Sequence, residues 1–318
     1  KYLNHQFFTN LNLMHRNCLP LVILMIFQFY IDAQVGINTT TPNAKAVLDL
    51  TSTNKGFLPP RMTEVQRNTI TSPVPSGLVI YCIDCGNYGQ LQVFNGVVWT
   101  DLTGGPAASF ICGTTTVSFR YNGNIVTYGT VLNTTTNECW LDRNLGASQV
   151  ATSGNNAAAY GDLFQWGRLD DGHQIRTSAT TTTLSLTDVP GHGDFILATP
   201  MPWDWRSPQN NSMWQGVNGI NNPCPNGYRI PTQAELDAER LSWGSQNPAG
   251  AFASPLKLTL TGARDYAAGI LNQVGLYGYY RCSTLHGIYS YYLYFGGTTA
   301  GILSTSRAHG WAVRCIKD

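Results

Sequence analysis

The chain has 318 residues, enough for one large domain and a smaller one. Charged residues make up only 12% of it, about half the usual share, and the formal net charge is +1. This composition excludes the basic surface that nucleic acid or an anionic membrane would require. The 16 Tyr and 8 Trp, set among many polar uncharged residues, are typical of a neutral extracellular surface.

The first 33 residues predict export. Residues 14–17 form a short basic region, residues 19–30 are a mainly apolar run, and Ala33 offers a cleavage point before Gln34. We interpret residues 1–33 as upstream sequence and a signal peptide that starts at Met14. The alternative, a buried core helix, fits the basic flank less well. An apolar run of this length is too short to span a bilayer, so we expect a secreted, extracellular or surface-held protein without a membrane span.

Residues 34–103 are expected to form a β-rich segment. Short apolar pairs are interrupted by turn-forming residues, a pattern that is poor for an independent core and favours pairing with an identical chain. Residues 77–82, 91–94 and 97–100 read as short strands, with a hairpin turn at Asn95-Gly96.

The order of motifs in this segment resembles surface proteins of Bacteroidetes-type bacteria and is similar to pieces of phage tail fibres. The motifs are V-G-I-N-T-T-T-P from residue 35, G-F-L-P-P-R-M-T-E-V-Q-R from residue 56, G-L-V-I-Y from residue 77, and Asn-Gly-x-x-Trp ending at Trp99. Such fibre pieces are usually trimeric, so the resemblance implies a homo-oligomer, a trimer formed through residues 34–103.

Residues 104–109 form the best candidate for a linker, and a domain of residues 110–318 follows it. A hairpin is expected over residues 117–128, with its turn at Asn122-Gly123. A helix is expected to begin after Thr232, because Glu235 completes a capping box, and to run to about Trp243. Leu236 and Leu241 are candidates for its inward face.

Seven cysteines remain after the proposed signal peptide, and in an oxidising compartment most should pair. We propose three disulfides and leave Cys282 as a free thiol, although spacing alone does not fix the connectivity. The proposed pairs are Cys82 with Cys85, Cys112 with Cys139, and Cys224 with Cys315.

Residues 110–318 resemble the Fibrobacter succinogenes major paralogous domain. The resemblance is carried by Y-G-D-L-F-Q-W-G-R from residue 160, N-P-C-P-N-G-Y-R-I-P-T from residue 222, and V-R-C ending at Cys315. It implies an α+β fold, a C-type lectin-like domain with long loops. The family usually has Tyr-Trp-Ser-Ser-Thr where this chain has Tyr-Arg-Cys-Ser-Thr ending at Thr284, so Cys282 is interpreted as an unpaired substitution.

No catalytic or metal site stands out. The chain has no Gly-x-Ser-x-Gly elbow for a nucleophilic hydrolase, and a single free thiol does not make the two-cysteine copper site of the formylglycine-generating enzymes that share the implied fold. Residues 170–173 and 191–194 place Asp and His on two Gly-flanked loops, but their spacing matches no known metal site and favours solvated turns. The calcium-dependent sugar motifs of C-type lectins are absent before Cys315. We therefore expect no enzyme, no metal and no cofactor, calcium being the one considered.

The most suggestive candidate for a ligand site is the aromatic loop, residues 201–215. Its aromatic faces could stack on sugar rings while Arg and Asn reach the hydroxyl groups. The alternative, which we favour, is that these aromatic side chains form the core of a loop-rich domain. The candidate ligand-binding residues are Trp203, Trp205, Arg206, Asn210 and Trp214.

The sequence thus predicts an exported, non-catalytic binding or adhesion protein of a bacterial surface. Its partners would be a glycan or a protein on another cell or matrix, together with copies of itself. The alternatives are a structural fibre or matrix subunit that only self-associates and, less favoured, an exported enzyme.

Overall fold

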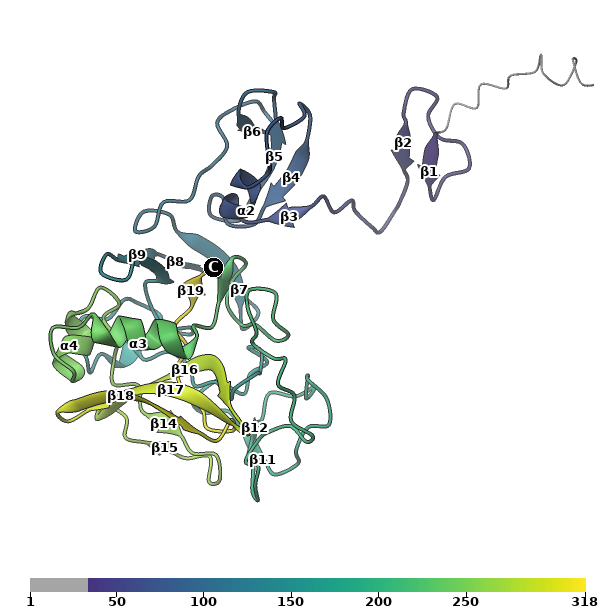
Figure 1. Ribbon diagram of the computed structural model, residues 1–318. Helices are drawn as coiled ribbons and strands as arrows, with labels where there is room; N and C mark the ends of the chain where they lie inside the picture. Colours follow the sequence, from purple (N-terminus) through teal and green to yellow (C-terminus); the bar gives the residue numbers. More distant parts are fainter. Residues whose placement is uncertain (1–33) are drawn as a thin grey trace, which may run out of the picture. The chain divides into compact units, whose positions relative to one another are not determined.

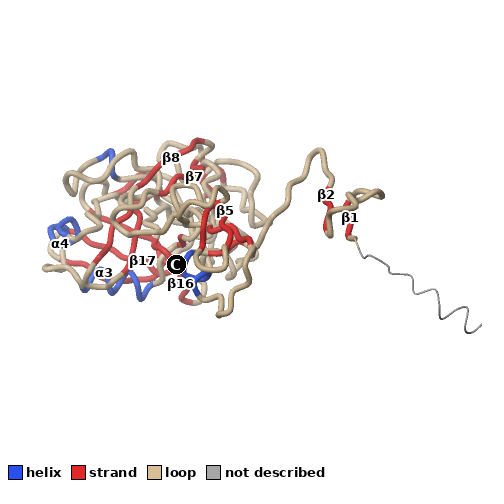
Figure 2. The backbone as a smooth tube through the Cα atoms, turned by 90° about the horizontal axis from the view of Figure 1, so that it is seen from above, coloured by secondary structure: helices blue, strands red, loops and turns tan. Residues whose placement is uncertain are grey.

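The structure, a computed structural model, describes residues 34–318. The expected signal peptide therefore lies outside the described residues. The chain divides into two compact units, residues 1–58 and residues 59–318, and each is described by itself (Figures 1 and 2). This division falls before Pro59 rather than at the expected linker, residues 104–109.

The described part of the first unit consists of two paired strands and their loops. Strands β1 (Val35–Ile37) and β2 (Leu48–Leu50) are parallel, with Gly36 opposite Asp49. None of residues 34–58 is buried. Seven apolar side chains of this short segment are 45% to 79% exposed: Val35, Ile37, Val47, Leu48, Leu50, Phe57 and Leu58.

The second unit begins with a four-stranded sheet in the order β3-β4-β5-β6. Thr63 caps the short helix of this region with a capping box, and Asn95-Gly96 forms the predicted hairpin turn, with Gly96 at φ 99°. A small core of Ile80 and the disulfide-bonded cysteines lies beneath the sheet. The elements are β3 (Arg61–Met62), α2 (Glu64–Asn68), β4 (Val79–Cys82), β5 (Gln90–Phe94) and β6 (Trp99–Asp101).

A hairpin and a second four-stranded sheet follow. The predicted turn at Asn122-Gly123 has positive φ at both residues (46° and 78°), which suits the tight turn of a two-residue hairpin. The sheet has the order β13-β19-β10-β9, so the last strand of the chain lies in its middle. The elements are β7 (Val117–Tyr121), β8 (Asn124–Tyr128), β9 (Thr130–Asn133), β10 (Glu138–Leu141), β13 (Tyr228–Arg229) and β19 (Ile316–Lys317).

The longest strands form a three-stranded antiparallel sheet near the C-terminal end (Figure 1). It comprises β16 (Tyr277–His286), β17 (Tyr289–Gly296) and β18 (Thr299–Thr305). The remaining elements are short: η1 (Ala157–Ala159), β11 (Thr180–Thr181), β12 (Phe195–Ile196), α3 (Gln233–Leu241), α4 (Pro248–Ala253), β14 (Ala263–Arg264) and β15 (Leu271–Asn272). Among the described helices, none is long and apolar enough to cross a membrane.

Helix α3 begins as predicted. The Thr232 side chain accepts a hydrogen bond from the Glu235 backbone N–H (3.3 Å), and the Glu235 carboxylate accepts one from the Thr232 N–H (2.7 Å). Leu236 is buried, whereas Leu241 is 63% exposed. The helix therefore presents only part of the expected inward face to the core.

The expected α+β fold, a C-type lectin-like domain with long loops, is wrong. In the described part of the chain the α-helices have only five, nine and six residues, while the sheets are the principal regular structure. The physical reason is the density of turn-forming residues, including 32 Gly and 16 Pro, which ends regular elements after a few residues. The domain is mainly β.

Two large clusters of buried side chains form the core of the second unit. One contains Trp166, Trp205 and Trp214 together with Phe164 and Tyr228. The other lies between α3, α4 and one face of the β16-β17-β18 sheet and contains Tyr280, Leu293 and Phe295. Because these rings are large, they supply the burial that a chain with few helices needs.

Candidate functional site

The disulfides have the pairing expected from the sequence. Cys82 is joined to Cys85, Cys112 to Cys139, and Cys224 to Cys315, with Cα–Cα distances of 5.4, 6.0 and 5.9 Å. The third one joins positions 91 residues apart. Cys282 is free and fully buried, and its burial raises the pKa of the thiol well above the ordinary value.

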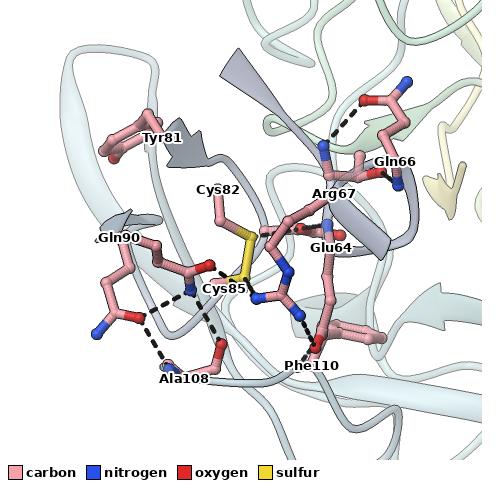
Figure 3. Close-up of a disulfide and its surroundings, with 12 residues drawn as sticks. Glu64, Gln66, Arg67, Tyr81, Cys82, Cys85, Gln90, Ala108 and Phe110 are labelled. Carbon is pink, nitrogen blue, oxygen red and sulfur yellow. Dashed lines mark hydrogen bonds and ion pairs between the residues drawn. A yellow bond between two sulfur atoms is a disulfide. The ribbon is translucent and has the colours of Figure 1, made fainter. Parts of the chain in front are cut away.

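The Cys82–Cys85 disulfide lies beside a buried polar network that involves helix α2 (Figure 3). The Arg67 guanidinium donates to Gln92 Oε1 (2.7 Å) and to Glu64 Oε1 (3.0 Å). Arg67 is itself buried. A buried guanidinium needs this many acceptors, so the network fixes helix α2 against the sheet.

The expected linker, residues 104–109, is bonded to this sheet. Gln90 Oε1 accepts a hydrogen bond from the Ala108 N–H (2.8 Å), and Glu64 Oε2 accepts one from the Phe110 N–H (2.6 Å) (Figure 3). Asp101 Oδ1 accepts another from the Gly105 N–H (2.8 Å). Residues 104–109 therefore lie along the sheet and are held to it by hydrogen bonds.

The C-terminal strand is tied to the disulfide loop by an ion pair. Lys317 Nζ lies 2.7 Å from Asp84 Oδ2, and the two side chains are 9% and 1% exposed. Asp84 Oδ1 also accepts a hydrogen bond from the Glu64 N–H (2.7 Å). The sheet β3-β4-β5-β6 and the sheet that contains β19 are thus joined through buried charges within the second unit.

Two of the candidate ligand-binding residues, Trp205 and Trp214, are core residues. Both are fully buried. The indole N–H of Trp205 donates to the Trp166 carbonyl (2.6 Å), and that of Trp214 donates to the Asn221 carbonyl (2.8 Å). Since both ring faces are covered and both polar atoms are bonded, these indoles do not form a platform for a ligand.

The other three candidates, Trp203, Arg206 and Asn210, remain partly exposed, and each contacts other residues of the protein. Arg206 and Asn210 both contact Asp188 Oδ1, at 2.7 and 2.9 Å. Trp203 is half-buried and stacks on Tyr289 with ring centroids 6.2 Å apart. Arg206 and Asn210 therefore hold the loop through Asp188, and the five candidate residues are divided between buried and partly exposed positions.

Of the two Asp- and His-bearing loops, residues 170–173 have the His173 ring bonded within the protein, whereas the side chains of His192 and Asp194 in the second loop are partly exposed. His173 Nε2 accepts a hydrogen bond from the Gln165 N–H (3.0 Å), and His173 Nδ1 donates to Asp171 Oδ1 (2.6 Å). Burial lowers the pKa of His173 to about 4, so the ring is neutral. Among the described residues, three side chains of metal-binding type lie close together at Cys82, Asp84 and Cys85. There the sulfurs are already joined to each other.

One comparison with known families gives a match. Residues 36–119, which are 84 of the 318 residues, match the model of a phage tail like trimerisation region. The matched residues overlap the motifs that resemble pieces of phage tail fibres, and the match supports a homo-oligomer of three chains. Nothing found supports the resemblance of residues 110–318 to the Fibrobacter domain. No curated protein and no solved structure matches the chain.

In the matched region of the second unit, Val65, Val97, Val98 and Leu102 are all more than half exposed. In the first unit, the seven exposed apolar side chains of residues 34–58, six of them inside the match, form the candidate functional surface. The sequence pattern of short apolar pairs signalled this surface. Individual residues could not be assigned to it without knowing which side of each strand is covered.

Proposed function

We propose that this protein is an exported, non-catalytic fibre-like subunit that assembles as a trimer through residues 36–119 and holds its remaining residues as a binding region for adhesion. The observation that carries the proposal is the composition of the first unit. Its paired strands bury no residue, yet seven of its apolar side chains are exposed. The match to a trimerisation region begins at residue 36 and covers these strands except for Val35.

The energetics favour association of this segment. A two-stranded sheet without a covered face is marginal in water by itself. Each Val, Leu, Ile or Phe side chain contributes about 1.5–3 kcal/mol when it is fully buried. Copies of the segment packed together would bury several such side chains in each chain, which is the gain that an isolated copy lacks.

Two further observations support export and a non-catalytic role. Three disulfides in one chain are typical of proteins that fold in an oxidising compartment. His173 has both ring nitrogens bonded and its imidazole fully buried, an arrangement that suits a structural residue.

A substitution pair tests the assembly. Leu50→Asp places a charge on strand β2 within the exposed apolar set, whereas Leu186→Asp places the same charge on an apolar side chain outside the matched region that is 78% exposed. We expect light scattering to give a trimer mass for the unmodified chain and for Leu186→Asp, and a smaller mass for Leu50→Asp at the same concentration. A monomer mass for the unmodified chain would refute the proposal.

The second candidate function is a purely structural subunit whose only partners are copies of itself. The burial of Trp205 and Trp214 favours it, because it removes two of the five candidate residues from any binding surface. A glycan array probed with the full chain, with calcium and with chelator, separates the two functions. Saturable binding supports adhesion, and a trimer that binds nothing supports the structural subunit.

A further inference from the structure

The outer face of the β16-β17-β18 sheet is rich in tyrosine. Register pairs Tyr279 with Tyr294, and Arg281 with Tyr292. Because side chains alternate along a strand, Tyr277, Tyr279, Tyr292 and Tyr294 lie on the face opposite to the helix-packed core. All four are only partly buried. The alternation of side chains along these strands therefore separates a covered face from an accessible one.

A cavity of about 470 Å³ lies at the edge of this face. Its aromatic wall consists of Tyr279, Tyr292 and Trp311. The Trp311 and Tyr279 rings are nearly parallel, at 17° with centroids 5.9 Å apart, and Tyr292 lies 4.0 Å from Trp311. Trp311 is only 3% exposed, so it serves as the floor while the two tyrosines form accessible sides.

The aromatic wall continues to a histidine. The His309 and Trp311 rings are within 9° of parallel, with centroids 5.2 Å apart. His309 Nδ1 is buried and has no hydrogen-bond partner in the described part of the chain. Burial lowers the pKa of His309 to about 4, so the imidazole is neutral near pH 7 and has one donor and one acceptor nitrogen.

Polar groups converge on the same cavity from the β14–β15 hairpin. The backbone bridge between Arg264 and Gly310 brings Asp265 beside the His309 segment. Asp265 Oδ1 accepts two backbone N–H bonds, at 2.9 and 2.7 Å, which holds the carboxylate in place. Gln273 Oε1 accepts a hydrogen bond from the Tyr279 hydroxyl, so the amide is oriented and its NH₂ group stays a donor.

The charges around the cavity select the class of ligand. The Arg281 guanidinium is buried and lies 4.2 Å from the Trp311 ring centre. It already makes the cation–π contact with this ring that a bound cation would require. The Asp265 carboxylate at the rim disfavours an anion. A neutral ligand with an apolar face and several hydroxyl groups fits the aromatic wall and the carboxylate, amide and imidazole groups.

We propose that this cavity binds a neutral sugar ring, packed against Tyr279 and Tyr292, which the buried Trp311 supports, and hydrogen-bonded by Asp265, Gln273 and His309. The inference rests on the proposed function, because a trimeric fibre outside the cell is where a glycan would be met. The residues that line this cavity do not include the aromatic loop of residues 201–215. Each trimer would present three such cavities, so weak single-site binding would be multiplied on a surface that carries many copies of the sugar.

Calorimetric titration of the full chain tests the site directly. The probes are neutral tetrasaccharides of glucose, mannose and N-acetylglucosamine, a uronic acid tetrasaccharide, and choline chloride. We expect at least one neutral probe to bind, and Tyr292→Ala to weaken its association constant by about tenfold or more. Asp265→Asn keeps the shape and the Oδ1 contacts of the side chain and should also weaken binding. Tyr294→Ala is the matched control, since it is on the same strand and face but does not line the cavity.

The outcomes separate this inference from the proposed function. Light scattering on the same samples reports the trimer independently of any ligand. Circular dichroism shows whether Tyr292→Ala is folded. If Tyr292→Ala is unfolded, the binding constant of Asp265→Asn tests the proposed site instead. Binding of choline or the uronic acid probe alone, equal losses in Tyr292→Ala and Tyr294→Ala, or no binding by a folded trimer would each overturn the assignment.

Discussion

The buried ion pair between Asp84 and Lys317 makes a strong prediction about stability. Lys317→Met keeps most of the side-chain volume but leaves the Asp84 carboxylate, whose side chain is 1% exposed, without its cation. Breaking a buried pair from one side costs about 3–5 kcal/mol. The remaining bond from the Glu64 N–H at the start of α2 favours the negative charge, so we expect a value near the lower end.

That loss corresponds to a fall in Tm on the order of 10 °C for a unit of this size. Thermal unfolding followed by circular dichroism, at one fixed protein concentration, measures it. Lys257→Met is the matched control, because Lys257 is exposed, and it should change stability by less than about 0.5 kcal/mol. The double variant Asp84→Asn with Lys317→Met should recover much of the loss. If Lys317→Met shifts Tm no more than Lys257→Met does, the proposed coupling between the two sheets is wrong.

Three further results are expected. N-ethylmaleimide should label Cys282 only after unfolding, because the thiol is buried with a raised pKa; labelling of the native protein at the rate of a free thiol would contradict its burial. Stability should fall as the pH drops from about 6.5 towards 4, because the unfolded chain binds protons at His173 and His309 that the folded chain, with both pKa values near 4, does not; a Tm that is constant over this range would refute it. Trp205→Ala should cost about 3–5 kcal/mol in urea unfolding and Trp203→Ala clearly less, and equal costs would argue against the assigned burial.

The sequence predicted local structure well where short-range chemistry decides it. The capping box of Thr232 and Glu235 places the start of α3, and Asn122-Gly123 places a hairpin turn. The α+β fold class was implied by the resemblance to the Fibrobacter domain, which nothing found supports, and it was wrong. Most strands have only two to five residues. Such short strands cannot be told from loops by periodicity, so the residue pattern alone could not correct the prediction.

The candidate sites were also hard to predict from local sequence, because tertiary packing decides which side chains are exposed and which meet. Trp205 and Trp214 are close in sequence to polar residues that resemble a sugar platform, but tertiary packing buries both rings. The cavity at Trp311 was missed because its parts come from distant positions. Asp265 and Tyr279 reach it only through the bridges of Arg264 to Gly310 and of Tyr280 to Ala312. No local pattern encodes such a meeting of separate strands.

The trimer is the central claim, and native mass spectrometry of the purified chain tests it most directly. The account predicts an assembly of three copies that persists on dilution and is lost when residues 34–58 are removed, because these residues carry exposed apolar side chains and bury none of their own. A mass of one chain at every concentration would contradict the account, and so would a trimer that forms equally well without those residues.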